Sequence, residues 1–75
     1  DIPTINTSKP LKRGDKNPEV INLRRILTIQ GDLADDNVTS AKFDEDVDKA
    51  LRQFQLRHML EADGVVGGKT KEALN

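Results

Sequence analysis

The chain contains no cysteine and a single histidine, His58. Without cysteine it can form no disulfide, and one histidine leaves no set of nitrogen and sulfur ligands for structural zinc. A domain of 75 residues buries only about 60% of the surface that its unfolded form exposes. We therefore expect one domain at most, without a metal or a cofactor, held together by the packing of its helices.

Charge of one sign and long apolar runs are also missing. The 12 basic and 13 acidic residues leave a net charge of -1 and interleave along the chain, so no electric field gathers nucleic acid or anionic lipid. No apolar run approaches the ~20 residues that cross a membrane, and the N-terminus has no signal-peptide pattern. The two phenylalanines, Phe43 and Phe54, fall on a buried register and leave no stacking platform for bases or sugar rings. We expect neither nucleic acid nor membrane as a partner.

The sequence is rich instead in helical periodicity. The first helix is expected over residues 18–30, because Asn17 suits the N-cap, Pro18 the first helical position and Gly31 the C-terminal stop. One face of this helix carries an apolar stripe formed by Val20, Leu23, Ile26 and Leu27.

The strongest periodic pattern lies over residues 44–58, where Asp44 caps the expected second helix. Its apolar stripe comprises Phe43, Val47, Ala50, Leu51, Phe54 and His58. A short third helix is expected over residues 68–74, after a tight turn at Asp63 and Gly64. These patterns predict an all-α fold, a compact three-helix bundle.

The starts of the second and third helices repeat one pattern. Each has an apolar residue, a capping position, and an Ala-Leu pair about a turn and a half later. The two copies are Phe43-Asp44 with Val47 and Ala50-Leu51, and Val66-Gly67 with Thr70 and Ala73-Leu74. This repeat predicts that both helices pack in a similar way against one core.

Residues 1–10 contain two prolines among mostly polar residues. This composition predicts an extended lead-in or linker before a domain over residues 11–75. Ile2 and Ile5 are candidates to dock on the domain. The polar stretch 32–42 predicts a loop. Three apolar residues, Ile21, Ile29 and Leu56, fall off the stripes. Ile21 and Ile29 either cover a second contact, such as the N-terminal arm, which we favour, or form a partner surface. Leu56 is an apolar exception on the polar face of the second helix.

No residue pattern predicts catalysis. His58 lies on the apolar stripe near a helix C-terminus, where a structural role is expected. Ser8 and Ser40 lie in polar segments with no histidine nearby in sequence. The acidic residues have the spacing neither of a calcium loop nor of paired catalytic carboxylates, and we interpret them as helix caps and solvated positions: Asp35, Asp36, Asp44, Glu45, Asp46 and Asp48.

Several ordered elements together resemble the peptidoglycan-binding domain 1 family from about Leu11 to the end of the chain. They are Leu11-Lys-Arg-Gly-Asp15, Gly31-Asp-Leu33, Phe43-Asp44, Phe54-Gln55 with His58, Asp63-Gly-Val-Val-Gly67, and Thr70 with Ala73-Leu74. The resemblance implies a non-catalytic three-helix accessory domain that holds murein hydrolases, carboxypeptidases or transpeptidases on the cell wall. The Gly31–Leu33 turn and the following acidic loop look most like the domain attached to Gram-negative L,D-transpeptidases.

Two positions depart from the family pattern. Met59 stands where the family commonly has glycine, so a left-handed backbone there would cost about 1 kcal/mol. Gly68 replaces the usual proline at the start of the last helix and should loosen that helix start. Transpeptidases of the suggested kind act through a cysteine, which this chain lacks, so the resemblance implies that the catalytic domain is absent from it.

The resemblance implies that the ligand is the peptidoglycan stem peptide and glycan. If the first two helices run antiparallel, the end of the second helix meets the Asp63-Gly64 and Arg13-Gly-Asp15 turns. The expected contacts are then Arg13, for carboxylates, and Asp15, Gln55 and Asp63, for amides or amines. Equally, Asp15 and Asp63 serve only to shape their turns. A rival function is docking onto a host catalytic domain in cis. Either way we expect a monomer in the bacterial envelope, in the periplasm.

Overall fold

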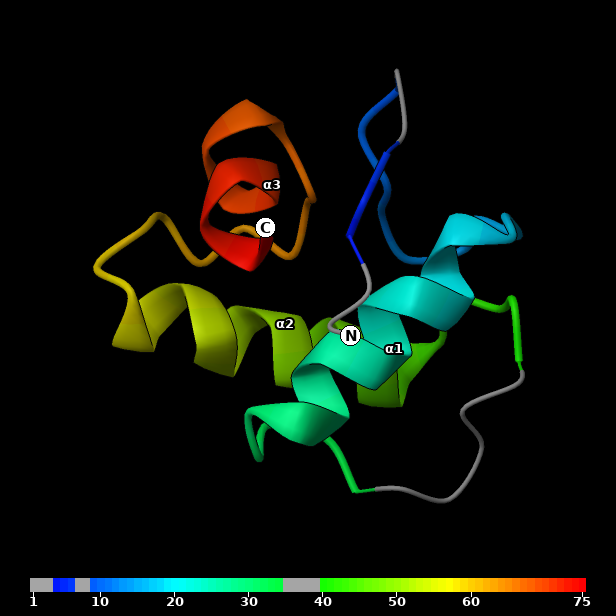
Figure 1. Ribbon diagram of the computed structural model, residues 1–75, viewed down its shortest axis with the longest axis horizontal. Helices are drawn as coiled ribbons and strands as arrows, with labels where there is room; N and C mark the ends of the chain where they lie inside the picture. Colours follow the sequence, from blue (N-terminus) through cyan, green and yellow to red (C-terminus); the bar gives the residue numbers. More distant parts are fainter. Residues whose placement is uncertain (1–3, 7–8, 35–39) are drawn as a thin grey trace.

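The computed structural model describes residues 4–6, 9–34 and 40–75. Within these ranges the chain forms three helices and no strand: α1 (Glu19–Ile29), α2 (Glu45–Arg57) and α3 (Gly68–Leu74) (Figure 1). The radius of gyration of 10.6 Å is close to the ~11 Å expected for a compact domain of this length. The predicted all-α, three-helix fold is confirmed, and the first two helices are one residue shorter at each end than expected.

The predicted caps explain where α1 begins and ends. The Asn17 side chain accepts a hydrogen bond from the Glu19 backbone N–H at 2.8 Å, and Pro18 already has helical angles. At the other end, Gly31 has a φ of +84°, and the next N–H donates back to the Leu27 carbonyl at 2.9 Å. This geometry is the glycine stop that the sequence predicts.

α2 begins at the predicted cap, and a strained residue, Met59, follows its C-terminal end. The Asp44 carboxylate accepts a hydrogen bond from the Val47 N–H at 3.1 Å. Met59 has a φ of +58° and a side chain that is 94% exposed. The left-handed backbone expected at Met59 is thus present, and no burial of its side chain offsets a strain of about 1 kcal/mol.

A single core joins the helices to their connections. Both phenylalanines are buried, as predicted, and the His58 ring, although exposed, stacks on Phe54 with centroids 4.2 Å apart. The two helix-start copies supply Phe43 and Val66 as equivalent buried residues. The buried apolar set is Ile5, Leu11, Val20, Leu23, Ile26, Leu27, Phe43, Val47, Ala50, Leu51, Phe54, Val66 and Leu74.

The N-terminal segment adds one residue to this core. Ile5 is 1% exposed, and its backbone N–H and carbonyl bond the side-chain amide of Asn75 at 2.7 and 3.0 Å. Figure 1 shows this blue segment beside α3 and α1. Ile5 thus docks as the sequence suggested, although it belongs to the predicted lead-in. The other docking candidate, Ile2, lies outside the described residues, as do Asp35 and Asp36.

The helices are not arranged as an antiparallel pair. Arg57, at the end of α2, donates to Asp32, just after the end of α1, at 3.0 Å. Arg24, in the middle of α1, contacts Asp44 at the start of α2 at 2.9 Å. Both helices therefore end on the same side of the molecule.

Candidate ligand-binding site

The turn at Arg13, Gly14 and Asp15 is tied to the start of α2. The Gly14 N–H donates to the Phe43 carbonyl, and the Phe43 N–H donates to the Asp15 carbonyl, both at 2.9 Å. Gly14 has a φ of +99°, which glycine adopts without strain. The Asp15 carboxylate accepts the Lys12 N–H at 3.0 Å and closes the turn. The expected turn-shaping role of Asp15 is therefore visible in the structure.

A groove of about 270 Å³ opens beside this turn. We call it the α2-start groove; it is lined by Gly14, Asp15, Lys16, Lys42, Phe43 and Asp44. Lys16 and Lys42 face each other across an isolated antiparallel bridge. Among the described residues neither ammonium group forms an ion pair. The groove thus offers two ammonium groups that form no ion pair with the described residues, beside the carboxylates of Asp15 and Asp44.

Arg13 lies next to the α2-start groove and has only a weak partner. Its guanidinium is 3.8 Å from the Glu45 carboxylate, and both side chains are more than half exposed. Exposed pairs of this kind contribute about 0–1 kcal/mol. A carboxylate ligand can therefore compete with Glu45 for Arg13 at little cost. A bidentate pair between Arg13 and the ligand would be stronger than the present pair with Glu45.

Asp44, in the wall of the α2-start groove, is held in place by a buried arginine. Arg24 is 2% exposed and donates to Asp44 at 2.9 Å and to the Lys42 carbonyl at 2.8 Å. Burial by itself would raise the pKa of Asp44, but the Val47 N–H and the Arg24 guanidinium together bring this pKa below its ordinary value. Asp44 is therefore an anion with fixed partners.

Gln55 is fully buried and holds the second turn together. Its amide nitrogen lies 2.9 Å from the Asp63 carboxylate, 3.1 Å from the Val65 carbonyl and 3.1 Å from the Thr70 hydroxyl. Its amide oxygen accepts the Gly64 N–H at 3.0 Å. Both polar atoms of the side chain are thus engaged within the protein, and its visible action is to position the turn.

Asp63 is exposed on the outside of this turn. Hydrogen bonds from the Val65 N–H and from Gln55 lower the pKa of Asp63, so its carboxylate stays charged at neutral pH. Gly64 has a φ of +71°, and a β-carbon added there would lie 2.3 Å from the Asp48 carboxylate. The Gly64 backbone therefore packs closely against α2, and the turn presents Asp63 to solvent.

Contacts in the structure tie both predicted turns to α2. Arg13 lies near Glu45 at the start of α2, and Asp63 is bonded to Gln55 further along the same helix. Gly64, next to Asp63, lies against Asp48 in the first turn of α2, and the segments that lead to the two turns are joined by the bridge between Leu11 and Val66. That Arg13, Asp15, Gln55 and Asp63 contact one ligand stays a prediction.

Sequence reasoning missed Lys16 and Lys42. Each is a single polar residue in an irregular segment, and 26 positions separate them in the chain. Their pairing arises from the bridge between the two segments. For Lys16, the only local indication of a binding role was its place in a polar turn before α1. For Lys42, the sequence before Phe43 gave no such indication.

Other classes of site are not found in the described parts of the chain. Residues 4–6, 9–34 and 40–75 hold no group of three or more His, Cys, Asp and Glu side chains placed to bind a metal ion. Within the same ranges, no helix has the length and apolar character needed to span a bilayer.

Comparisons with known proteins show which family and which solved structure this architecture matches. Residues 16–74 match the model of a family described as "Putative peptidoglycan binding domain". Seven chains among the solved structures also match. One of them, titled "The crystal structure of SleB N-terminal domain", is 31% identical to this chain, with a TM-score of 0.83 and coverage of 91% of this chain and 90% of that chain. No curated protein matches the sequence.

Proposed function

Because this chain belongs to the peptidoglycan-binding domain family, we propose that it binds peptidoglycan stem peptides in the α2-start groove and thereby holds a linked enzyme at the cell wall. The family is one of binding domains, and the structural match to the SleB N-terminal domain supports the same module. We propose no catalytic role for the chain.

The two ammonium groups of the α2-start groove carry this proposal. Stem peptides bear free carboxylates, and Lys16 and Lys42 face each other where such a group can contact both. Arg13 lies beside them and would lose only its weak ion pair with Glu45 when it binds a ligand. Asp15 completes the site as an acceptor for peptide N–H groups. The buried ring of Phe43 supports the floor.

Asp63 supplies a second, separate contact in this proposal, to an amine or amide of the ligand. Gln55 acts on the ligand only through Asp63, because its own amide is buried and hydrogen-bonded. Gly64, beside Asp63, packs against Asp48 in the first turn of α2, so a stem peptide in the α2-start groove lies near this second contact.

Each contact is exposed and polar, so we expect weak binding by one domain. Linkage to an enzyme turns weak binding into a high local concentration at the wall. We propose that the enzyme is an L,D-transpeptidase or a murein hydrolase in the periplasm, and that the domain acts as a monomer.

Retention on purified sacculi at low salt tests the proposal. The double variant Lys16→Gln/Lys42→Gln should lose most retention, because it removes both groove cations. Arg25→Gln removes one cation from an exposed position on α1 outside the groove and should retain wild-type binding. NMR titration with a defined muropeptide should shift the amide signals of Gly14, Lys16 and Phe43. Equal retention of the double variant and the wild type would refute the groove assignment.

A second candidate function is docking onto the host catalytic domain. Ile29 and Leu56 are 60% and 67% exposed, so packing within the domain does not account for them, while Ile21 is half-buried. Under this alternative, Leu56→Ser weakens association with the host domain and leaves retention on sacculi unchanged. A variant that loses sacculus binding instead would count against docking.

A further inference from the structure

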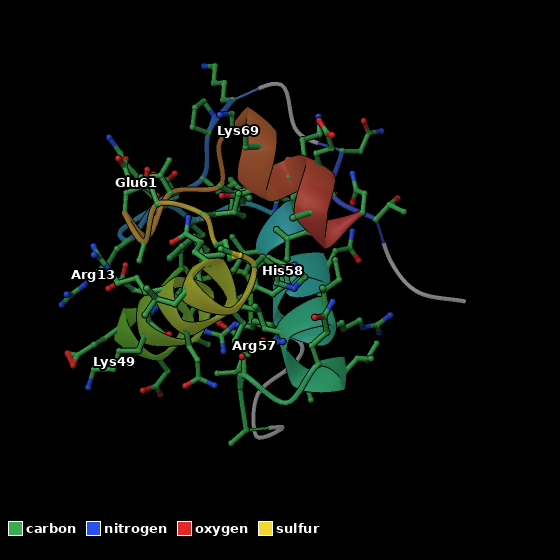
Figure 2. The ribbon with its side chains drawn as sticks, turned by 90° about the vertical axis from the view of Figure 1, so that its left-hand side faces the viewer. Arg13, Lys49, Arg57, His58, Glu61 and Lys69 are labelled. Carbon is green, nitrogen blue, oxygen red and sulfur yellow. The ribbon has the colours of Figure 1, made fainter. Side chains whose placement is uncertain are left out.

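A second and larger groove lies between the segment after α2 and the outer face of α3. We call it the α3 groove; its volume is about 440 Å³, and it is lined by Leu60, Lys69, Glu72 and Ala73. None of these residues belongs to the α2-start groove. Figure 2 shows Lys69 at the start of α3 and His58 at the end of α2, on either side of the connecting segment.

The charges in the α3 groove are of opposite sign and lack partners in the described chain. Lys69 and Glu72 are three residues apart on α3, which places both on one face of the helix. They form no ion pair with each other or with any other described residue. The groove therefore presents one cation and one anion side by side, and both are available to a ligand.

The remaining lining is apolar and firmly held. Ala73 packs against the core, and Leu60 is partly buried, with its N–H bonded to the Gln55 carbonyl at 2.8 Å. The Thr70 hydroxyl, also bonded to Gln55, fixes α3 to the same residue. One wall is thus bonded to the backbone of Gln55 and the other to its side chain, so the spacing of the two walls is set before a ligand arrives.

The complementary ligand is an aliphatic chain that ends in both a carboxylate and an ammonium group. We propose that the α3 groove binds the distal amino-acid end of a diamino-dicarboxylic acid residue in the stem peptide, as in meso-diaminopimelate. Lys69 pairs with its carboxylate and Glu72 with its ammonium group, while Leu60 and Ala73 contact its methylene groups. This assignment rests on the proposed function and adds which stem peptide the domain prefers.

The same geometry predicts discrimination against lysine-type stem peptides. A lysine side chain brings the methylene groups and the ammonium group, but no carboxylate for Lys69. One exposed ion pair contributes little to affinity, so we expect a preference of about threefold for the diaminopimelate peptide. The preference is small, but both peptides can be measured on the same protein sample.

Two matched probes test this proposal by NMR titration of the whole chain: L-Ala-γ-D-Glu-meso-diaminopimelate and L-Ala-γ-D-Glu-L-Lys, both with C-terminal amides. The first should bind about threefold more tightly and shift the amide signals of Leu60, Lys69 and Ala73. Lys69→Gln should remove the preference, and Lys69→Arg should keep it. Glu72→Gln should weaken both peptides to a similar degree. Arg25→Gln, with its lost charge elsewhere on α1, should behave as the wild type.

The outcomes separate the two proposals. Shifts confined to the α2-start groove, with equal affinities for both peptides, would overturn the α3 groove assignment and leave the proposed function standing. Absence of binding to either peptide, together with no retention on sacculi, would overturn both. A preference that survives Lys69→Gln, in a variant with an unchanged fold by its amide spectrum, would also overturn the role of Lys69.

Discussion

The starts of α2 and α3 have nearly the same backbone shape but are stabilised by different means. Asp44, before α2, has φ -95° and ψ -173°, and Gly67, before α3, has φ -91° and ψ -166°. Asp44 accepts the Val47 N–H with its own carboxylate. Gly67 has no side chain to offer, and α3 has no side-chain cap.

α3 is held instead by contacts from elsewhere in the chain. Gln55 bonds the Thr70 hydroxyl, and Val66 exchanges two backbone hydrogen bonds with Leu11, at 2.8 and 3.4 Å. A helix of seven residues is too short to be stable alone. A helix start with its own cap is stabilised by a local contact, whereas an uncapped one depends on tertiary contacts.

Removing the tertiary contact of α3 should have the largest effect. Gln55→Leu replaces the buried amide with an apolar side chain of similar size and leaves the Gly64 N–H and the Thr70 hydroxyl without their partner. We expect a loss of about 3 kcal/mol in the free energy of unfolding, measured by urea denaturation. Gln53→Leu, an exposed control on the same helix, should cost under about 1 kcal/mol. Similar losses for the two variants would remove Gln55 as the support of α3.

Removing the local cap of α2 should have the next largest effect. Asp44→Ala loses the hydrogen bond to Val47 and leaves the buried Arg24 with only the Lys42 carbonyl. We expect a loss of about 2 kcal/mol, of which the cap contributes about 1. Asp46→Ala, an exposed residue in the first turn of the same helix, serves as the control in the same urea series. A loss as small as that of the control would show that α2 also depends mainly on packing.

Acid should act on the two helix starts through different carboxylates. The pKa values of Asp44 and Asp63 are lowered in the folded state, so their stabilisation is present above the pKa of the unfolded chain and is lost as pH falls through the lowered values. Urea midpoints should therefore fall as the pH drops below about 5. Asp44→Asn and Asp63→Asn should each flatten this dependence, by less than the Asp44→Ala effect, because both carboxylates are largely solvated. Unchanged slopes in both variants would contradict this assignment.

Making the start of α3 locally stable should have the smallest effect, and in the opposite direction. Gly68 is the first residue of α3 and has open space around its α-carbon, and Gly67 before it has the extended backbone that proline favours. Gly68→Pro should raise the unfolding free energy by about 0.5 kcal/mol. Gly68→Ala is the control without a fixed φ. A destabilised proline variant would mean that the Gly68 N–H is needed in the folded state.

The helices and their caps could be predicted because their signals are local. Asn17, Gly31 and Asp44 each act within four residues of their own position. The same holds for the left-handed backbone at Met59, which follows from where α2 ends. Such interactions leave a pattern in adjacent sequence positions.

The candidate site could be predicted only in part, because its pairs are distant in sequence. Asp15 and Arg13 were found from one turn, but the opposing Lys42 comes from a segment across the domain. Gln55 was assigned to a ligand, and burial instead places its amide inside the Asp63–Val65 turn. Whether a polar side chain faces solvent or protein is decided by its neighbours in space.

By itself, the sequence determined three helices, their boundaries to within one residue, the buried phenylalanines and the resemblance to a cell-wall-binding family. Only the tertiary structure decided that α1 and α2 end on the same side, that Ile5 is bonded to Asn75, and that two grooves open at the start of α2 and along α3. The reason is physical. Periodicity and capping act over one or two helical turns, whereas a groove forms where segments far apart in the chain meet.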